Sequence, residues 1–511
     1  MRRPICATYV ILALLLSTGA SAQLVPVVPV PLPAVPVSPA PTVSAVTDTV
    51  VTTVKSVAKA VPGVRKVTTT VGSAVEAPQG IAGATQPLRS TTRASSLLDA
   101  PLTRAGTGPP ATAAAAPTAA PARPPLARDP APSIGLDRVA SLPASPTPAG
   151  EAALAGARTV RLQTLIRQNP QDLDSDDLGQ PIVRGQLVLL DVDEASLTRL
   201  ERSGFKLLAD EQHPQLALRL TTLQVPAGFS ARSALVRLRA IAPRIEADYN
   251  HIFEPAGGSL GAARAGPAKG GGTSGPLVGM IDGGVAAHPS LAGRIVEQKG
   301  FTGALKATRH GTAIASLLVG KQGRFRGSAP GARLLVADVY GGRASAGSAT
   351  AIARAMSWLA ARRPAVINIS LVGPRNELVR RAVAGLRTRG IEIVAAVGND
   401  GPAAPPQYPA SYPGVIAITG VDARGVVLFE AGNAAGLDFA APGADMAAAR
   451  PGNGYARVRG TSFAAPLAAG RLAQLRSPKQ LAAEARPGKG RVGQGIVCAA
   501  CRIAPQLVGA K

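Results

Sequence analysis

The feature that most constrains the fold is a series of short apolar segments between residues 276 and 476, which alternate with segments of helical periodicity. Continuously apolar strands are typical of a parallel sheet covered by helices on both faces. The apolar segments predict strands at residues 276–282, 332–340, 365–373, 391–398 and 414–422, and the periodic ones predict helices at 348–363 and 377–390. We therefore expect a doubly wound, mostly parallel α/β domain with its active site at the carboxyl ends of the strands.

Residues 180–254 show a different order of signals, in which strands and helices follow one another as βαββαβ. Gly204 follows the first helical stretch, and Ser230 stands at the N-cap position of the second. This order predicts a small α+β domain of the ferredoxin-like type. The fold alone indicates no function.

The N-terminal part of the chain lacks the pattern of a packed domain. Arg2 and Arg3, an apolar run and the small residues Ala20–Ala22 predict a secretory signal peptide at residues 1–22. We therefore expect export to the periplasm, the cell surface or the medium, with no transmembrane span in the mature chain, because no later apolar run is long enough. Residues 23–155 are rich in Pro, Ala and Thr and predict a disordered linker, because such sequence buries too little apolar surface.

The formal net charge of +25 is carried mostly by scattered arginines. Aromatic residues are scarce and no nucleic-acid motif is present, so we expect no nucleic-acid partner and favour association with anionic cell surfaces. Cys498 and Cys501 form a CAAC pattern near the C-terminus. A local disulfide is favoured in an oxidising compartment, while a redox motif and a zinc site stay open as alternatives.

Three short motifs place an acid, an imidazole and a hydroxyl at strand ends or helix starts. Asp282 ends the first strand in MIDGG, His310 begins a helix in RHGTA, and Ser462 begins another in RGTSFAAP. A serine hydroxyl is a weak nucleophile unless a base activates it and a third group orients that base. The simpler interpretation of Ser462 is a helix N-cap. The chain order Asp, His, Ser is that of subtilisin and not that of chymotrypsin or the α/β-hydrolases.

Seven pieces of sequence between residues 276 and 476 resemble the subtilisin-like serine proteases, or subtilases, in order and spacing. They are LVGMIDGGVAAHPSL, RHGTAIASLLVG, AMSWLAARRPAVINISLVGP, AAVGNDG, YPASYPGVIAITGVD, DFAAPG and GYARVRGTSFAAPLAAG. One such motif is weak evidence, but seven in register are specific. The resemblance implies a serine endopeptidase that acts on protein or peptide substrates through an acyl-enzyme. Asp282, His310 and Ser462 would be its triad, and Asn399 would donate to the oxyanion beside the N–H of Ser462.

The resemblance also implies where a substrate would bind. The segments SLVG and AVG would line the cleft, through Ser370, Leu371, Val372, Gly373, Ala396, Val397 and Gly398. An extended substrate would pair there as an added strand. The family usually has glycine at position 372 and alanine at position 397, so the two valines predict a narrow pocket for small or slim apolar residues. Asp400 near the rim would instead favour a basic residue.

Three departures from the family pattern concern the site. Gly283 stands where the family usually has the Ser or Thr that fixes the aspartate, so the backbone or water must support Asp282. Ala313 replaces a second histidine, and Ser290 replaces an acidic residue that some relatives use for calcium. Calcium prefers several oxygen ligands, so it has no support here. We predict no metal ligands and no required cofactor.

The resemblance gives the small upstream domain a role, because subtilases often carry an N-terminal propeptide of this pattern, which assists folding and blocks the active site. We expect the chain's own propeptide at residues 180–254, acting as inhibitor and chaperone, and a glycine-rich processing junction at 255–275. An independent binding domain is the alternative.

These expectations describe an exported serine endopeptidase made as a self-processing precursor. Two other interpretations stay open: a catalytically inactive relative that binds peptides, and a surface-attachment protein whose functional part is the Pro/Ala-rich region. The expected organisation is a signal peptide (1–22), a linker (23–155), a propeptide-like domain (180–254), a junction (255–275), a catalytic domain (276–476) and a C-terminal tail with CAAC (477–511).

Overall fold

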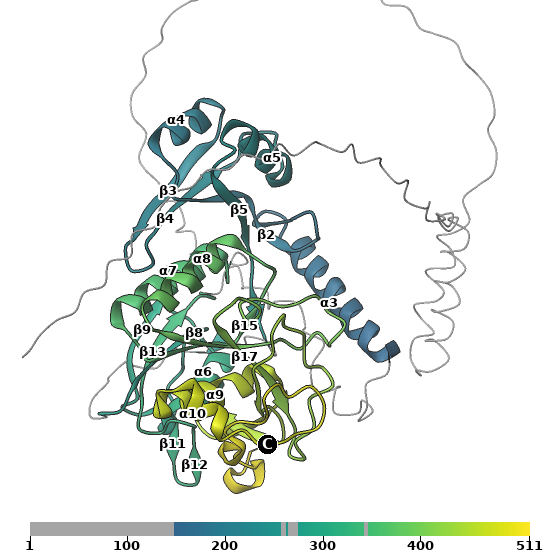
Figure 1. Cartoon of the computed structure of the whole chain (residues 1–511), viewed down its shortest axis with the longest axis vertical. Helices are drawn as coiled ribbons and strands as arrows, with labels where there is room; N and C mark the ends of the chain where they lie inside the picture. Colours follow the sequence, from purple (N-terminus) through teal and green to yellow (C-terminus); the bar gives the residue numbers. More distant parts are fainter. Residues whose placement is uncertain (1–147, 257–261, 264–273, 342–345, 511) are drawn as a thin grey trace, which may run out of the picture. The chain divides into compact units, whose positions relative to one another are not determined.

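The computed structural model describes residues 148–256, 262–263, 274–341 and 346–510 (Figure 1). The predicted signal peptide, the predicted linker up to residue 147 and most of the predicted junction lie outside the described residues. Within the described part of the chain, no helix has the length and apolar character needed to cross a membrane.

Seven parallel strands form the central sheet of the downstream domain. From edge to edge they are β18 (Phe439–Pro442), β17 (Val415–Val421), β16 (Glu392–Ala396), β14 (Val366–Ile369), β8 (Leu277–Asp282), β13 (Arg333–Asp338) and β9 (Ile295–Gly300). The five predicted strands are all present. The sequence pattern misses β9, whose residues are mostly polar and partly exposed, and β18, which has four residues and ends in a proline.

Two pairs of helices cover the two faces of this sheet, which confirms the doubly wound class. The helices α7 (Ala349–Arg362) and α8 (Glu377–Thr388) pack in one buried cluster, and α6 (Arg309–Val319) and α9 (Thr461–Leu475) pack in the other. Figure 1 shows the two pairs on opposite sides of β8 and β17. The helices α6 and α9 are rich in alanine and glycine, which allows them to pack close together on their face of the sheet.

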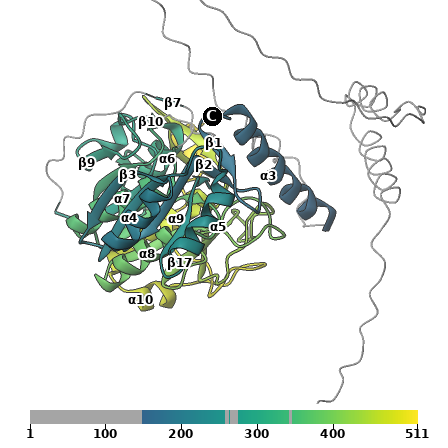
Figure 2. The same cartoon turned by 90° about the horizontal axis from the view of Figure 1, so that it is seen from above.

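The small domain has the predicted βαββαβ order. Its antiparallel sheet runs β5 (Glu246–His251), β2 (Pro181–Leu190), β4 (Leu218–Gln224) and β3 (Lys206–His213), and α4 (Glu194–Arg202) and α5 (Ala231–Ile241) cover one face (Figure 2). The opposite face, which includes Leu218 and Leu220, belongs to the same buried cluster as α7 and α8. The small domain therefore packs through its own sheet face against the helices α7 and α8 of the catalytic domain.

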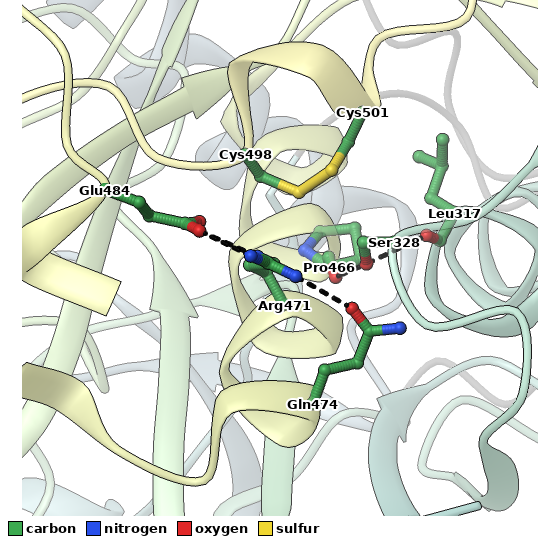
Figure 3. Close-up of a disulfide and its surroundings, with 8 residues drawn as sticks. All are labelled: Leu317, Ser328, Pro466, Arg471, Gln474, Glu484, Cys498 and Cys501. Atoms are coloured by element: carbon green, nitrogen blue, oxygen red, sulfur yellow. Dashed lines mark hydrogen bonds and ion pairs between the residues drawn. A yellow bond between two sulfur atoms is a disulfide. The ribbon is translucent and has the colours of Figure 1, made fainter. Parts of the chain in front are cut away.

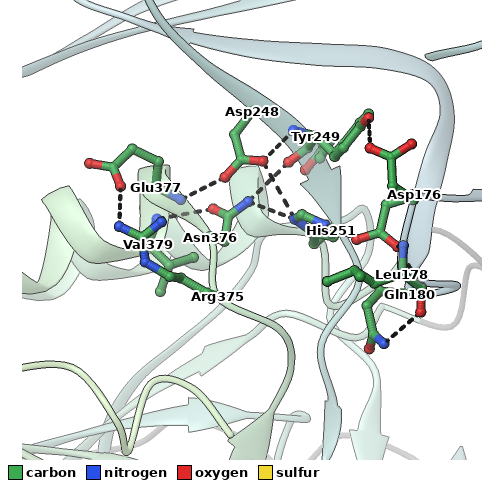
Figure 4. A network of polar contacts seen from close by, with 12 residues as sticks. Asp176, Leu178, Gln180, Asp248, Tyr249, His251, Arg375, Asn376, Glu377 and Val379 are labelled. Atoms are coloured by element: carbon green, nitrogen blue, oxygen red, sulfur yellow. Dashed lines mark hydrogen bonds and ion pairs between the residues drawn. The ribbon is translucent and has the colours of Figure 1, made fainter. Parts of the chain in front are cut away.

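Polar side chains add specificity to this apolar contact between the small domain and α8 (Figure 4). Asn376 is the N-cap of α8, and its Oδ1 accepts from the N–H of Val379 at 3.2 Å. Its Nδ2 donates to the carbonyl of Tyr249 at 3.0 Å and lies 3.0 Å from Nδ1 of His251. Nε2 of His251 lies 3.1 Å from Asp176. The side chain of the N-cap residue of α8 is thus held in place by residues of the small domain.

A long helix, α3 (Pro148–Gln168), precedes the small domain, and its first residues fall inside the range predicted as a disordered linker. The linker prediction therefore extends too far, because the alanine content of residues 148–155 also suits a helix. Proline occupies the first helical position, Glu151 lies in the first turn and Arg167 in the last, as the helix dipole favours. The following β1 (Leu173–Ser175) pairs with β2 and was likewise not predicted.

The residues after α9 pack on the catalytic domain. They contain α10 (Pro478–Ala483) and the disulfide Cys498–Cys501, which lies beside α9 (Figure 3). Arg471 of α9 donates to Glu484 at 2.8 Å. Shorter elements are β6 (Glu254–Pro255) with β15 (Leu371–Val372), β7 (Ala262–Ala263) with β10 (Ala307–Thr308), β11 (Lys321–Gln322) with β12 (Phe325–Arg326), β19 (Met446–Ala449) with β20 (Tyr455–Val458), and the 3₁₀ turns Pro289–Leu291, Ala499–Cys501 and Pro505–Val508.

Candidate active site

Asp282 and His310 meet at the carboxyl edge of the central sheet. Asp282 is the last residue of β8, and His310 is the second residue of α6. Nδ1 of His310 lies 2.9 Å from each carboxylate oxygen of Asp282, and both side chains are buried. A carboxylate at Nδ1 holds the proton on that nitrogen, so Nε2 is left as the basic atom.

The backbone supports Asp282 where the sequence lacks the usual hydroxyl. The N–H of Gly283 donates to Oδ1 of Asp282 at 2.7 Å. A Cβ at position 283 would stand 2.3 Å from Oγ1 of Thr308 and 2.5 Å from its Cγ2. Thr308 cannot easily move, because its Oγ1 caps α6 by accepting from the N–H of Gly311 at 2.9 Å. Glycine at 283 and threonine at 308 therefore fit each other.

Ser462 lies in the first turn of α9, but it is not the N-cap. Gly460 takes that position with a φ of 137°, which favours glycine. The simpler interpretation of Ser462 as a helix cap is therefore wrong. Among the described residues, Oγ of Ser462 and Nε2 of His310 are both buried without a hydrogen-bond partner. The hydroxyl and the basic nitrogen are thus both unengaged.

The backbone carbonyl of Ser462 is bound by a residue of the predicted substrate segment instead of by its own helix. Pro466 lies inside α9 and has no N–H, so it cannot bond the carbonyl of Ser462 four residues earlier. Oγ of Ser370 donates to that carbonyl at 2.9 Å, and Asn368 donates to Ser370 at 3.0 Å. Sequence reasoning missed Asn368, although its place at the end of a buried strand was a usable signal.

Both ends of the Asn399 amide bind backbone groups. Its Oδ1 accepts from the N–H of Thr461 at 2.9 Å, which leaves Nδ2 to donate elsewhere. Nδ2 closely contacts the carbonyl oxygen of Ala256, the last residue described before the gap at 257–261. The N–H of Ala256 donates to the carbonyl of Ser370 at 2.9 Å. The amide of Asn399 thus binds a backbone carbonyl of this chain.

Comparisons with known proteins agree with this geometry. A model of the subtilase family matches residues 273–487. Subtilisin Savinase of Lederbergia lenta is 33% identical over 208 residues, which are 40% of this chain and 77% of that protease. The chain belongs to the subtilase family of serine endopeptidases.

Two further similarities place this subtilase among its relatives. The alkaline protease of Alkalihalobacillus alcalophilus is 33% identical over 40% of this chain and 54% of its own length. The crystal structure of fervidolysin from Fervidobacterium pennivorans, a keratinolytic enzyme related to subtilisin, has a TM-score of 0.53 at 20% identity, over 64% of this chain and 62% of that one. The latter likeness shows the fold.

The segment that follows the small domain of this subtilase lies beside the predicted substrate-binding residues. β6 (Glu254–Pro255) pairs antiparallel with β15 (Leu371–Val372). On the other side, the N–H of Phe253 donates to the carbonyl of Gly347 at 2.9 Å. The segment thus lies as an added strand beside β15, with the turn before α7 on its other side, and pairing as an added strand is the arrangement predicted for a substrate.

The side chains of this segment occupy two buried environments. The Phe253 ring is fully buried and would contact any Cβ at Gly373. Ala256 is 2% exposed and belongs to the same buried cluster as Val372 and Ala396. Val397 belongs instead to the cluster that holds Phe253. Val372 and Val397 thus belong to different buried clusters, and the narrow pocket expected from the two valines stays a prediction.

Three predicted substrate residues remain, and they contact the segment after the small domain or the residues around Ser462. They are Leu371, Gly373 and Gly398. Leu371 pairs with Pro255, and Gly373 exchanges backbone hydrogen bonds with Tyr408. The N–H of Gly398 donates to Oγ1 of Thr461 at 3.1 Å. These contacts fix the backbone on which Asn399 and Ser462 stand.

An ion pair that the sequence did not suggest joins the loops of Asn399 and Ser462. Nε of Arg459, three residues before Ser462, lies 2.8 Å from Glu430, whose side chain is 1% exposed. The backbone carbonyl of Glu430 accepts from the N–H of Gly401 at 3.0 Å. Glu430 therefore contacts the loop before Ser462 with its side chain and the loop after Asn399 with its backbone.

No group of three or more His, Cys, Asp or Glu side chains among the described residues is arranged to hold a metal ion. Ser290, at the position considered for calcium, contacts His288 through its hydroxyl at 2.8 Å. Ala313, which stands where the family usually has a second histidine, is buried in α6.

Proposed function

We propose that this subtilase is made as a precursor that cuts its own chain between Ala256 and Gly257. The observation that carries the proposal is the contact between Nδ2 of Asn399 and the carbonyl oxygen of Ala256. An oxyanion hole must bind the carbonyl of the bond that is cut, and the pairing of Glu254–Pro255 with Leu371–Val372 supports Ala256 as the residue before that bond. The cut would fall within the junction predicted from the sequence.

The chemistry follows from the residues around that carbonyl. Oγ of Ser462 would attack the carbonyl carbon of Ala256, and Nε2 of His310 would take the hydroxyl proton. Asp282 would hold the imidazole and stabilise its charged form. The tetrahedral oxyanion would accept from Nδ2 of Asn399, and the backbone N–H of Ser462 would be the second donor.

Collapse of that intermediate completes the cut. The C–N bond breaks, the His310 imidazolium gives its proton to the leaving amine of Gly257, and Ala256 remains as an ester on Ser462. Water then attacks the ester with His310 again as base, which releases the carboxylate of Ala256 and restores the serine. The same steps would apply to protein or peptide substrates bound as an added strand.

The small domain would be the inhibitor in this scheme, because its sheet is docked on α7 and α8 and its last strand leads into the cleft. We propose export by the signal peptide at residues 1–22, to the periplasm, the cell surface or the medium. The catalytically inactive alternative would bind segments such as Glu254–Pro255 without cutting them.

N-terminal sequencing of the chain beside its Ser462→Ala variant tests the proposal. The wild-type chain should yield a new N-terminus at Gly257, and the variant should stay uncut when expressed alone. A fluorophosphonate that labels the wild type but not the variant would exclude the inactive alternative. A variant that still matures by itself, or a new N-terminus elsewhere, would contradict self-cleavage at Ala256.

A further inference from the structure

The helix α3 presents one face to the rim of the cleft. Leu154, Arg158 and Arg161 follow one another at spacings of four and three, so they lie on the same side of the helix. A Cβ at Gly401 would stand 3.1 Å from Leu154, which shows that the leucine packs on the loop after Asn399. This helix lies outside the βαββαβ pattern.

Both arginines of this face bind the carboxylate next to Asn399. Nε of Arg158 lies 3.2 Å from Asp400. Nη2 of Arg161 lies 3.0 Å from the other carboxylate oxygen of Asp400 and 3.3 Å from Glu254. The side chains of Arg158 and Asp400 are only 10% and 8% exposed, so this pair is shielded from water.

The same helix is fixed to the small domain. Nη2 of Arg158 donates to Oε1 of Gln180 at 2.8 Å. Leu165 packs against a buried cluster formed by Leu173, Val183 and Ile252. Arg161 also reaches Glu254 in the strand that fills the cleft. Thus α3 contacts the inhibitory domain, the segment in the cleft and the cleft rim.

From these contacts we infer that the rim at Asp400 and Gly401 is a docking surface for an arginine-bearing helix, and that α3 is its partner. The inhibitory unit then begins at residue 148, ahead of the βαββαβ domain. Arg158 and Arg161 hold residues 148–256 on the catalytic domain after the bond following Ala256 is cut. This inference rests on the proposed function for the inhibition, but not for the docking itself.

The docking is tested in the full chain carrying Ser462→Ala, so that no cleavage interferes. Amide hydrogen exchange in residues 148–168 should become about tenfold faster or more with Arg158→Ala and Arg161→Ala together. Arg167→Ala removes the same charge from the exposed last turn of this helix, where Arg167 donates to Thr164 of the same helix at 3.1 Å, and should leave the exchange unchanged.

A variant on the other side of the contact controls for the possibility that the arginine substitutions change the helix itself. Asp400→Asn leaves α3 untouched and should speed exchange in residues 148–168 as the arginine variants do. Exchange at the wild-type rate in both Asp400→Asn and the double arginine variant would overturn the docking surface.

The retention role is tested in the chain with an intact serine. The onset of hydrolysis of a fluorogenic peptide after dilution should come about tenfold sooner, or more, in the double arginine variant than in the Arg167→Ala control. An unchanged onset beside faster exchange would overturn the retention role. If no variant hydrolyses the peptide, the proposed function fails, and the exchange experiment still decides the docking.

Discussion

At the scale of single residues, the support of Asp282 shows how one substitution fits its surroundings. The sequence indicated only that a hydroxyl is missing at position 283 and that the backbone or water must replace it. The structure assigns this role to the N–H of Gly283, which donates to Asp282 at 2.7 Å. It also shows why a hydroxyl-bearing residue does not fit there: Thr308 occupies the space.

Gly283→Ser should destabilise the catalytic domain by about 1–3 kcal/mol, because the new Cβ would overlap the side chain of Thr308. It should also lower kcat, since Thr308 caps the helix that carries His310. Urea unfolding in the Ser462→Ala background and peptide hydrolysis in the active chain measure the two effects.

Gly436→Ser is the matched control, because a Cβ at Gly436 meets nothing within 4 Å. Equal stability of the two variants would show that the packing of Thr308 against Gly283 does not restrict position 283.

At the scale of elements, the sequence predicted the five central strands of the catalytic sheet and both helices that face the small domain, because their apolar patterns are long and regular. It could not predict β6, since two residues form a strand only when β15 lies beside them. The same holds for α3, whose contact face is set by three residues that pair with Asp400, Gly401 and Glu254. Contacts between distant segments leave no periodic signal.

The sequence also placed Asp282 and His310 at one edge of the sheet, because strand ends and helix starts converge there, and the structure brings these two side chains into contact. Its assignment of Val372 and Val397 to one narrow pocket stays a prediction, since the two side chains belong to different buried clusters. The strand β16 ends at Ala396, and Val397 packs with Phe253.

Ala256→Trp should block processing at this position, because Ala256 is 2% exposed and lies in a cluster with Val372. Mass spectrometry of the expressed chain measures the processed fraction, which should fall at least about tenfold. Adding Val372→Ala should restore part of it by enlarging the pocket.

Ala227→Trp, at an exposed position of the small domain, serves as control and should be processed like the wild type. Wild-type processing of the Ala256→Trp chain would mean that the pocket does not select small residues.

At the scale of the whole molecule, two buried histidines couple stability to pH. Burial lowers the pKa of His288 below its ordinary 6.5 and lowers that of His213 as well. Nδ1 of His288 accepts from the N–H of Ser290 at 3.1 Å, and Nε2 faces the carbonyl of Gly454 at 2.9 Å. Protonation of Nδ1 would break the first contact, so the folded chain holds this imidazole neutral.

The sign of the pH effect follows from these lowered pKa values. The unfolded chain takes up protons first as the pH falls below about 6.5, so the free energy of unfolding should decrease from there toward acid. Urea unfolding of the Ser462→Ala chain between pH 8 and pH 5 should show this decrease, and His288→Gln should make it shallower. An identical pH slope in the two chains would contradict the assignment to His288.

The docked face of the small sheet also bears on what would happen to the small domain after the proposed cleavage. Leu218 and Leu220 share one buried cluster with α7 and α8, so separation would bare apolar surface on both partners at once. Such patches favour rebinding, aggregation or digestion over a stable free state. A cleaved small domain would therefore remain intact only while it is bound to the catalytic domain. Its degradation after release would make maturation irreversible.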